Sequence, residues 1–242
     1  MSERRSGTLY LIPVALGGAD AHSVLAPATV ESARGLRTFI AENAKSARGF
    51  LKAIGHPGPL QDIQIHLLDE HSGARDIEAL LALLTAGRDC GLVSEAGCPA
   101  VADPGAALVR RAHEAGVRVI PLIGPSSILL ALMASGLNGQ NFAFNGYLPV
   151  EKAERERRLK ELDRQAQGET QIFIETPYRN VAMLQALAEH CRGDTLLCLA
   201  VDLTMADGFV ATRTIAEWKR KPPVLDRRQV VFLIFRPDRG PK

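Results

Sequence analysis

The feature of this chain that most constrains its fold is a regular alternation of short apolar runs with longer helical patterns. In the first half, β-branched apolar runs typical of buried strands occupy residues 8–14, 38–41, 63–68, 90–93 and 117–122. Between them, helical patterns occupy residues 24–36, 44–54, 75–85 and 106–115. Strands that alternate with helices in this way predict a parallel sheet with helices on its faces.

The pattern changes after the Asn-Gly-Gln-Asn sequence at residues 138–141. Strand patterns follow at residues 171–175, 196–202, 209–212 and 229–235, and helical patterns at residues 153–167 and 180–191. Their spacing combines hairpin and crossover connections, which predicts a mixed sheet. We therefore expect an α/β protein with two α/β domains: residues 1–123 with a mainly parallel sheet and residues 124–242 with a mixed one.

Composition narrows the class of protein. The net charge of +2 is too near neutral to indicate a surface that attracts nucleic acid or membranes as a whole. No apolar run approaches the ~18 residues that span a bilayer, and the N-terminal Met-Ser-Glu-Arg-Arg-Ser-Gly lacks the apolar core of a signal peptide. The 4 cysteines and 6 histidines show no metal-ligand spacing. We expect a soluble cytoplasmic protein without a metal site.

The loop at residues 94–105, Ser-Glu-Ala-Gly-Cys-Pro-Ala-Val-Ala-Asp-Pro-Gly, follows the strand pattern at 90–93 and leads into a helix. Ligands of open α/β sheets bind where such loops gather, at the carboxyl ends of the strands. Gly97 allows close approach or a positive φ, while Glu95 and Asp103 offer acceptors for hydroxyls or a cation. An ordinary strand–helix connection would have the same composition.

A second loop of this kind follows the strand pattern at 117–122. Gly124 and Pro125 turn the chain, and Ser126 and Ser127 open an apolar helix over residues 128–135. Serine as a cap and proline near a helix start are ordinary initiation signals, so the segment alone means little. Because it lies about thirty residues after the first loop, again at the end of a strand, the two loops could face one pocket.

These two loops, with Gly-Tyr-Leu-Pro at 146–149 and Glu-Thr-Pro-Tyr-Arg at 175–179, resemble the tetrapyrrole-methylase superfamily of S-adenosylmethionine (SAM) methyltransferases. The resemblance is closest to the ribosomal RNA small subunit methyltransferase I branch, whose members methylate a cytidine ribose 2′-hydroxyl, and it runs from about Leu9 to Phe235. It implies two α/β domains with SAM in a cleft between them, and a homodimer with contacts in the second domain.

The resemblance also implies which residues bind SAM. Methyl transfer is an in-line displacement that depends on alignment of nucleophile, methyl group and sulfur, and it needs no metal. The implied cofactor-binding residues are Pro13 in the first loop, then Ser94, Glu95, Ala96, Gly97, Val101, Pro125, Ser126, Ser127, Tyr147 and Leu148. Asp103 joins them as a candidate acceptor for the hydroxyls of the adenosine ribose or the methionine group.

The acceptor side follows the family pattern less closely. Glu42 stands where the resembled enzymes carry the first of two acidic residues, but Asn43 replaces the second. The Asp-Glu-His-Ser sequence at 69–72 resembles a His-Glu-His-Asn segment. We take Glu42, Glu70 and His71 as candidates for proton handling; a strand-end carboxylate facing water and a surface-loop histidine are the alternatives.

Four further residues are candidates for contact with the acceptor: Lys45, Arg48, Tyr178 and Arg179. A guanidinium fork suits carboxylate and phosphate equally, but a buried Glu175–Arg179 pair that organises the second domain would explain the motif as well. Basic and acidic residues interleave over residues 151–164, which favours a solvated helix over an RNA-binding face. Residues 218–221 add positive charge near the C-terminus.

We expect a SAM-dependent methyltransferase with RNA, or the small ribosomal subunit, as acceptor. A tetrapyrrole methyltransferase of the uroporphyrin type is one alternative. A SAM-binding protein without catalysis is another, because the segments at 42–48 and 69–72 depart from the family pattern.

Overall fold

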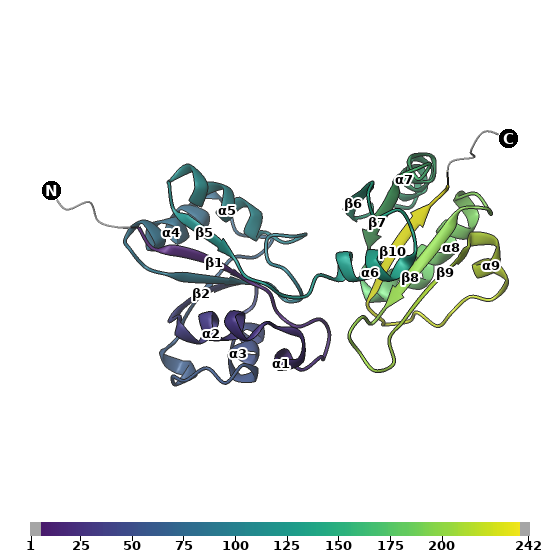
Figure 1. Cartoon of the computed structure of the whole chain (residues 1–242). Helices are drawn as coiled ribbons and strands as arrows, with labels where there is room; N and C mark the ends of the chain where they lie inside the picture. Colours follow the sequence, from purple (N-terminus) through teal and green to yellow (C-terminus); the bar gives the residue numbers. More distant parts are fainter. Residues whose placement is uncertain (1–5, 238–242) are drawn as a thin grey trace. The chain divides into compact units, whose positions relative to one another are not determined.

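The structure, a computed structural model, describes residues 6–237 of the chain, which forms two compact units, Met1–Ser126 and Ser127–Lys242 (Figure 1). Each unit contains one five-stranded sheet. Within the described residues, no helix combines the length and apolar character needed to cross a membrane.

Unit 1 contains a parallel sheet in the order β3-β2-β4-β1-β5. Its strands are β1 (Thr8–Ile12), β2 (Thr38–Ala41), β3 (Gln64–Leu67), β4 (Cys90–Val93) and β5 (Arg118–Pro121). Val93, the last residue of β4, lies opposite both Ile12 and Ala41. The three central strands therefore end level, and the loops that follow them leave from one edge of the sheet.

Helices cover both faces of this sheet, as the alternation in the sequence predicts (Figure 1). Side chains of successive strand residues point to opposite faces, so Phe39 belongs to one buried cluster and Ile40 to the other. The helices of unit 1 are α1 (Ala21–Val24), α2 (Pro27–Gly35), α3 (Ala44–Ala53), the short η1 (Leu60–Asp62), α4 (Ala74–Thr85) and α5 (Gly105–Glu114). The clusters show that α2 and α3 cover the Phe39 face, and α4 and α5 the Ile40 face.

Two local predictions for unit 1 were wrong. The single helix over residues 24–36 is two helices, because Pro27 occupies the start of α2 and holds the preceding residue in an extended conformation. The strand over residues 8–14 ends at Ile12, and Val14 instead forms an isolated antiparallel bridge with Gly97.

Unit 2 contains the predicted mixed sheet, in the order β6-β7-β10-β8-β9. Among the strand pairs that the described residues form in this sheet, β6–β7 is parallel and the other three are antiparallel. The strands are β6 (Phe142–Tyr147), β7 (Thr170–Ile174), β8 (Leu196–Val201), β9 (Phe209–Thr214) and β10 (Val230–Phe235). Sequence patterning missed β6, an edge strand without fully buried residues whose pairing is irregular between Phe144 and Tyr147.

Helices also cover both faces of the second sheet. They are α6 (Ser127–Ser135), α7 (Lys152–Gln165), η2 (Pro177–Arg179), α8 (Asn180–His190) and α9 (Ile215–Arg220). Leu132 of α6 lies in a buried cluster with Leu233, whereas α7, α8 and α9 contribute to the larger cluster around Phe232 on the other face. Sequence analysis did not predict α9, which is only six residues long and begins with a capping box between Thr214 and Glu217.

Candidate functional site

The loops at the carboxyl edge of unit 1 contact one another directly. The amide of Val14, after β1, donates to the carbonyl of Gly97, after β4, at 2.9 Å. A Cβ added to Gly124, after β5, would lie 2.4 Å from Cβ of Pro13, so only glycine allows the β5 loop to come so close to the β1 loop. The predicted cofactor segments after β1, β4 and β5 therefore form one continuous surface.

The β4 loop has an unusual backbone. Gly97 has a φ of 70°, and Ala100 and Ala102 have φ values of 65° and 60°, in the left-handed region that L-residues with a Cβ rarely occupy. The Asp103 carboxylate stabilises this shape: it accepts from the amide of Ala100 at 2.8 and 2.9 Å and from the amide of Gly105 at 2.8 Å. Asp103 thus holds the loop and the start of α5.

Burial raises the pKa of Asp103, and its hydrogen bonds from the Gly105 and Ala100 amides oppose that rise. Ser94 is also used within the loop, where its hydroxyl contacts the carbonyls of Ala96 and Gly97 at 3.3 and 3.2 Å. Both side chains, predicted as direct cofactor contacts, thus already have partners in the loop that carries them.

A hydrogen bond joins the predicted acceptor segment to the predicted cofactor loop. The Ser46 hydroxyl, on α3 after β2, donates to Oε1 of Glu95 at 2.8 Å. Asn43 caps α3: its side-chain oxygen accepts from the amides of Lys45 at 2.8 Å and Ser46 at 3.2 Å. Asparagine and aspartate are equally good caps, so Asn43 keeps the helix start that an acidic residue would provide.

Glu42 lies at the point where the acidic residues of this edge converge. Its pKa is raised, first by burial and then by the negative charges of Asp103, Glu95, Asp69 and Glu70. The pKa of Asp69 is lowered instead, first by a hydrogen bond from the Ser72 hydroxyl and then by one from the His71 amide. The surroundings of Glu42 thus make its carboxylate a better proton acceptor than a carboxylate in water.

The other two candidates for proton handling lie in water. Glu70 and His71 approach each other at 3.6 Å, and the side chain of each is 84% exposed. Lys45 and Arg48 are also exposed, on α3. The structure therefore places these four near the edge of the sheet but gives none of them a buried position.

The candidates in unit 2 differ widely in exposure. Tyr147 ends β6 with an exposed side chain, whereas Leu148 is buried in the larger core. Tyr178 is 79% exposed. Arg179 donates from Nε to Oε1 of Glu175 at 2.9 Å, and the side chain of Glu175 is 1% exposed. The Glu-Thr-Pro-Tyr-Arg motif thus contains a Glu–Arg pair in which the glutamate is buried and the arginine is 29% exposed.

The charged helix α7 has the paired surface predicted for a solvated helix. Arg158 pairs with Glu161 at 2.6 Å, one helical turn away, and Lys152 approaches Glu156 at 3.9 Å. Arg158 also donates to the side-chain oxygen of Asn145 on β6 at 2.6 Å. Some of the cations of α7 are therefore neutralised by partners within unit 2.

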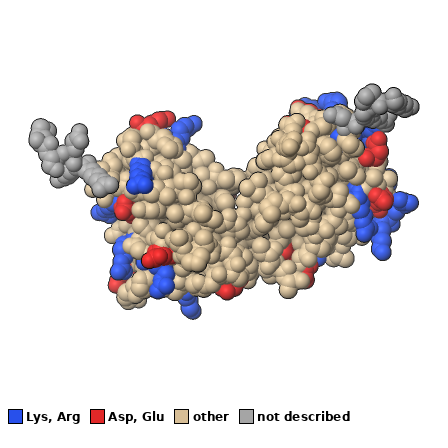
Figure 2. Space-filling model, in the orientation of Figure 1, with Lys and Arg blue, Asp and Glu red and all other residues tan. Residues whose placement is uncertain are grey.

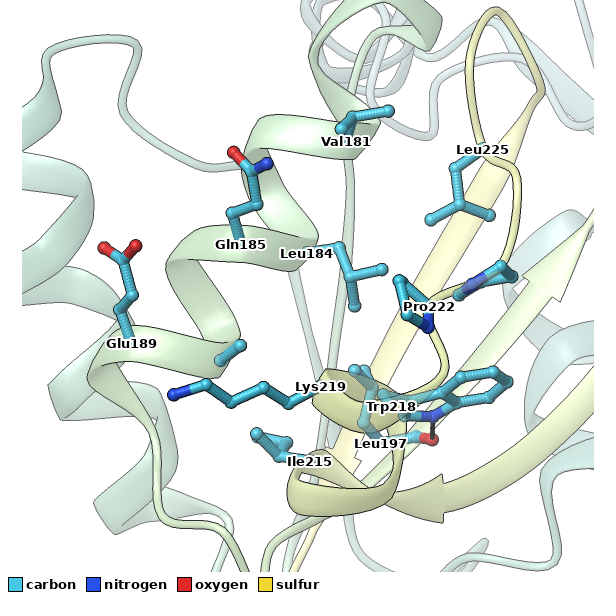
Figure 3. A pocket seen from close by; sticks show the side chains of 12 residues that line it. Val181, Leu184, Gln185, Glu189, Leu197, Ile215, Trp218, Lys219, Pro222 and Leu225 are labelled. Atoms are coloured by element: carbon cyan, nitrogen blue, oxygen red, sulfur yellow. Dashed lines mark hydrogen bonds between the residues drawn. The ribbon is translucent and has the colours of Figure 1, made fainter.

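A pocket of about 370 Å³ lies between α8 and α9 in unit 2 (Figure 3). Leu184, Trp218 and Leu225 form apolar walls, and the indole N–H of Trp218 donates to the carbonyl of Leu197 at 2.8 Å. None of the residues predicted from the sequence to bind cofactor or acceptor lines it. Sequence analysis gave no signal for this pocket, because α9 itself was not predicted.

The cysteines of the chain are free. Burial raises the pKa of Cys98 in the β4 loop and raises the pKa of Cys191 to about 12, so neither thiol is activated as a nucleophile. Over residues 6–237, no group of three or more His, Cys, Asp and Glu side chains is arranged to hold a metal ion.

Comparison with known proteins agrees with this architecture. The profile of the tetrapyrrole (corrin/porphyrin) methylases matches residues 8–219. The chain is 29% identical to "Ribosomal RNA small subunit methyltransferase I" of Pseudomonas aeruginosa over 95% of this chain and 79% of that protein. It is 33% identical to the protein of the same name from Neisseria meningitidis serogroup B, over 87% of this chain and 69% of that protein. The crystal structure of the methyltransferase CobJ has the same fold, with a TM-score of 0.62, 20% identity and 94% coverage of each chain.

The parallel sheet with its glycine-rich edge, the mixed second sheet and the match over most of the chain define the class: this chain belongs to the tetrapyrrole methylases and is a methyltransferase. Within that family it groups with the ribosomal RNA small subunit methyltransferase I proteins. The family and the two-sheet α/β fold expected from the sequence are thereby confirmed.

Proposed function

We propose that this methyltransferase takes its methyl group from SAM and transfers it to a ribose 2′-hydroxyl of small-subunit ribosomal RNA. The main support for an RNA acceptor is the 33% identity, over 87% of the chain, to a relative whose name specifies small-subunit ribosomal RNA as its substrate. A ribosomal acceptor is a component of the cytoplasm, the expected location of the protein.

The residues of the β4 loop suit SAM as a cofactor. A side chain at Gly97 would be strained by the φ of 70° and would place its Cβ 3.2 Å from Cδ2 of Leu16, so this position keeps a bare backbone, which we propose faces SAM. Val101 adds an exposed apolar side chain for the adenosine, while Ser126 and Ser127 add hydroxyls for the methionine group. The family resemblance adds Pro13, Glu95, Ala96, Tyr147 and Leu148 to the proposed set, with Ser94 and Asp103 shaping the loop. Because the side chain of Leu148 is buried in the core of unit 2, we propose that it contributes through its backbone.

When bound, SAM supplies a methyl group on a cationic sulfur. We assign Glu42 as the base that accepts the ribose proton while the ribose oxygen bonds to the methyl carbon. The carbon–sulfur bond breaks in the same step, and sulfur keeps the electron pair. A raised pKa improves a carboxylate as a proton acceptor near neutral pH, and Glu42 has one. Glu70 and His71 are the competing candidates.

On the acceptor side, Lys45 and Arg48 are exposed cations on the helix that follows Glu42, positioned to contact RNA phosphates. Tyr178, exposed at the start of η2, offers a ring on which a base can stack. Arg179 acts through its pair with Glu175, by holding the backbone that carries Tyr178.

The family's name favours one second candidate, a tetrapyrrole acceptor. Transfer of radiolabelled methyl from SAM distinguishes the two, with small ribosomal subunits, bulk RNA and a uroporphyrinogen offered in parallel. Label on RNA supports the proposal, and label only on the tetrapyrrole refutes it. Calorimetric binding of SAM with no transfer to any of the three would point to a protein that binds the cofactor without using it.

We also propose that the protein is a homodimer. On α6, Ala131 and Leu132 are buried, while Leu129 and Met133, one turn apart, expose an apolar stripe, and Met133 is 79% exposed. A second copy would cover that stripe. Sedimentation of Met133→Glu should shift toward monomer relative to wild type, whereas Val150→Glu, at a site outside α6 that is 71% exposed, should not.

A further inference from the structure

Unit 2 carries a second concentration of charge, at the C-terminal end of α9 and the neighbouring edge strand β9. Figure 2 shows Lys and Arg side chains crowded at the margin of unit 2 where Figure 1 places α9. A shallow hollow there is lined by Thr212, Arg213, Glu217, Arg220 and Lys221. Its three cations outnumber its one carboxylate.

Unlike Lys152 and Arg158 of α7, these three cations form no ion pair within the described part of the chain. Arg213, Arg220 and Lys221 are exposed, and among residues 6–237 none of the three forms an ion pair within 4 Å. The one carboxylate of the hollow, Glu217, instead accepts from the amide and hydroxyl of Thr214, at 2.8 and 2.7 Å. These hydrogen bonds are the first cause of the lowered pKa of Glu217, and the charges of Arg220 and Arg213 lower it further without forming an ion pair within 4 Å.

The arginine on β9 has a fixed orientation. The guanidinium carbon of Arg213 lies 4.8 Å from the centre of the buried Trp218 ring. A guanidinium that stacks in this way keeps its N–H groups in a defined plane, so little side-chain freedom is lost when it binds an oxyanion. Lys219, by contrast, extends along the apolar pocket toward α8 and does not line the hollow (Figure 3).

We infer that Arg213, Arg220 and Lys221 form a docking surface for the phosphate backbone of RNA. Three cations without partners beside a hollow suit a polyanion, and phosphate contacts position an RNA without reading its sequence. This inference rests on the proposed RNA acceptor and extends it, because it gives unit 2 a role in holding the substrate.

The test is a triple variant, Arg213→Gln, Arg220→Gln and Lys221→Gln. Its matched control is Arg157→Gln, Lys160→Gln and Arg164→Gln on α7, which removes the same charge from exposed positions. Binding to an unmodified small-subunit ribosomal RNA transcript is measured by fluorescence anisotropy across a salt series. Each phosphate contact on a single strand contributes about −0.7 to the slope of log K against log salt, so loss of three should flatten the slope by about 2 and weaken binding roughly 100-fold near 0.1 M salt.

A charge-preserving variant separates electrostatics from folding. Arg213→Lys with Arg220→Lys should keep the wild-type salt slope, even if the altered stack on Trp218 lowers the melting temperature. A triple variant whose slope and affinity match those of the α7 control overturns the inference. Binding of the wild type to phosphatidylglycerol vesicles but not to RNA, with loss in the triple variant, would also overturn it.

Methyl transfer separates this inference from the proposed function. The triple variant should raise KM for the RNA while kcat and the affinity for SAM stay unchanged, since none of the three residues belongs to the proposed cofactor site. A wild-type protein that binds RNA through this surface but methylates none would refute the proposed acceptor and leave the docking surface standing.

Discussion

Replacement of Asp103 tests how the glycine-rich loop is held. Asp103→Ala removes the acceptor of the Ala100 and Gly105 amides, which it contacts at 2.8–2.9 Å. Hydrogen bonds to an ionised group contribute about 1.5–3 kcal/mol each, so the two amides together set an upper limit of about 6 kcal/mol. Burial raises the pKa of Asp103, which shows that its charge is costly here, and truncation removes that cost too. We expect a net loss of about 2 kcal/mol in the free energy of unfolding.

In Asp103→Ala the structural change should be confined to the β4 loop, and it should lower the affinity for SAM. Without its acceptor, the loop has no compensation for the positive φ values of Ala100 and Ala102, which cost about 1–2 kcal/mol each. It should relax toward other conformations and lose SAM affinity by tenfold or more, about 1.4 kcal/mol. Asp103→Asn keeps one acceptor oxygen and should show about half of each effect.

The measurements are denaturant unfolding followed by far-ultraviolet circular dichroism, and calorimetric titration with SAM. Tryptophan fluorescence is unsuitable for unit 1, because Trp218 is the one tryptophan of the chain and lies in unit 2. The control is Asp20→Ala, which removes one amide contact of 3.2 Å at the start of α1 and should cost about 1 kcal/mol or less. Wild-type stability and SAM affinity in Asp103→Ala would refute the assigned role.

Four further predictions concern three other residues. Glu42→Gln should lower methyl transfer to RNA by about 10²–10⁴-fold with SAM affinity unchanged, whereas unchanged transfer would exclude Glu42 as the base. Because the folded-state pKa of Glu42 is raised, its ionised form destabilises the fold. Glu42→Gln should therefore increase the free energy of unfolding at pH values above that pKa, and this gain should vanish as the pH falls below 4.5. Urea titrations at several pH values would measure it. Arg179→Ala leaves the buried Glu175 charge uncompensated and should cost about 3–5 kcal/mol in urea unfolding; a loss below 1 kcal/mol would mean that the pair contributes little. Asn43→Ala should cost about 0.5–2 kcal/mol by loss of the α3 cap, and Asn43→Asp should restore it, as thermal melts would show.

The strands of unit 1 were predictable because a parallel strand is buried on both faces and must be apolar throughout. The run at residues 38–41 is buried at every position, and so is the run at 90–93; both predicted spans coincide with β2 and β4. The break at Pro27 also had a local signal, because proline restricts the residue before it, but the helical pattern around it concealed the signal. In unit 2, β6 had no such signal, since an edge strand with partly exposed residues lacks the apolar run of a central strand.

The sequence by itself determined the family, the two α/β units and the residue types at the sheet edge, because local patterns and ordered motifs carry that information. Only the tertiary structure decided how those residues are used. Ser46 reaches Glu95 across 49 positions of sequence, and Val14 pairs with Gly97, because parallel strands bring distant loops to one edge. The raised pKa of Glu42 has the same origin: it depends on burial and on the carboxylates of other loops, and spacing along the chain specifies neither.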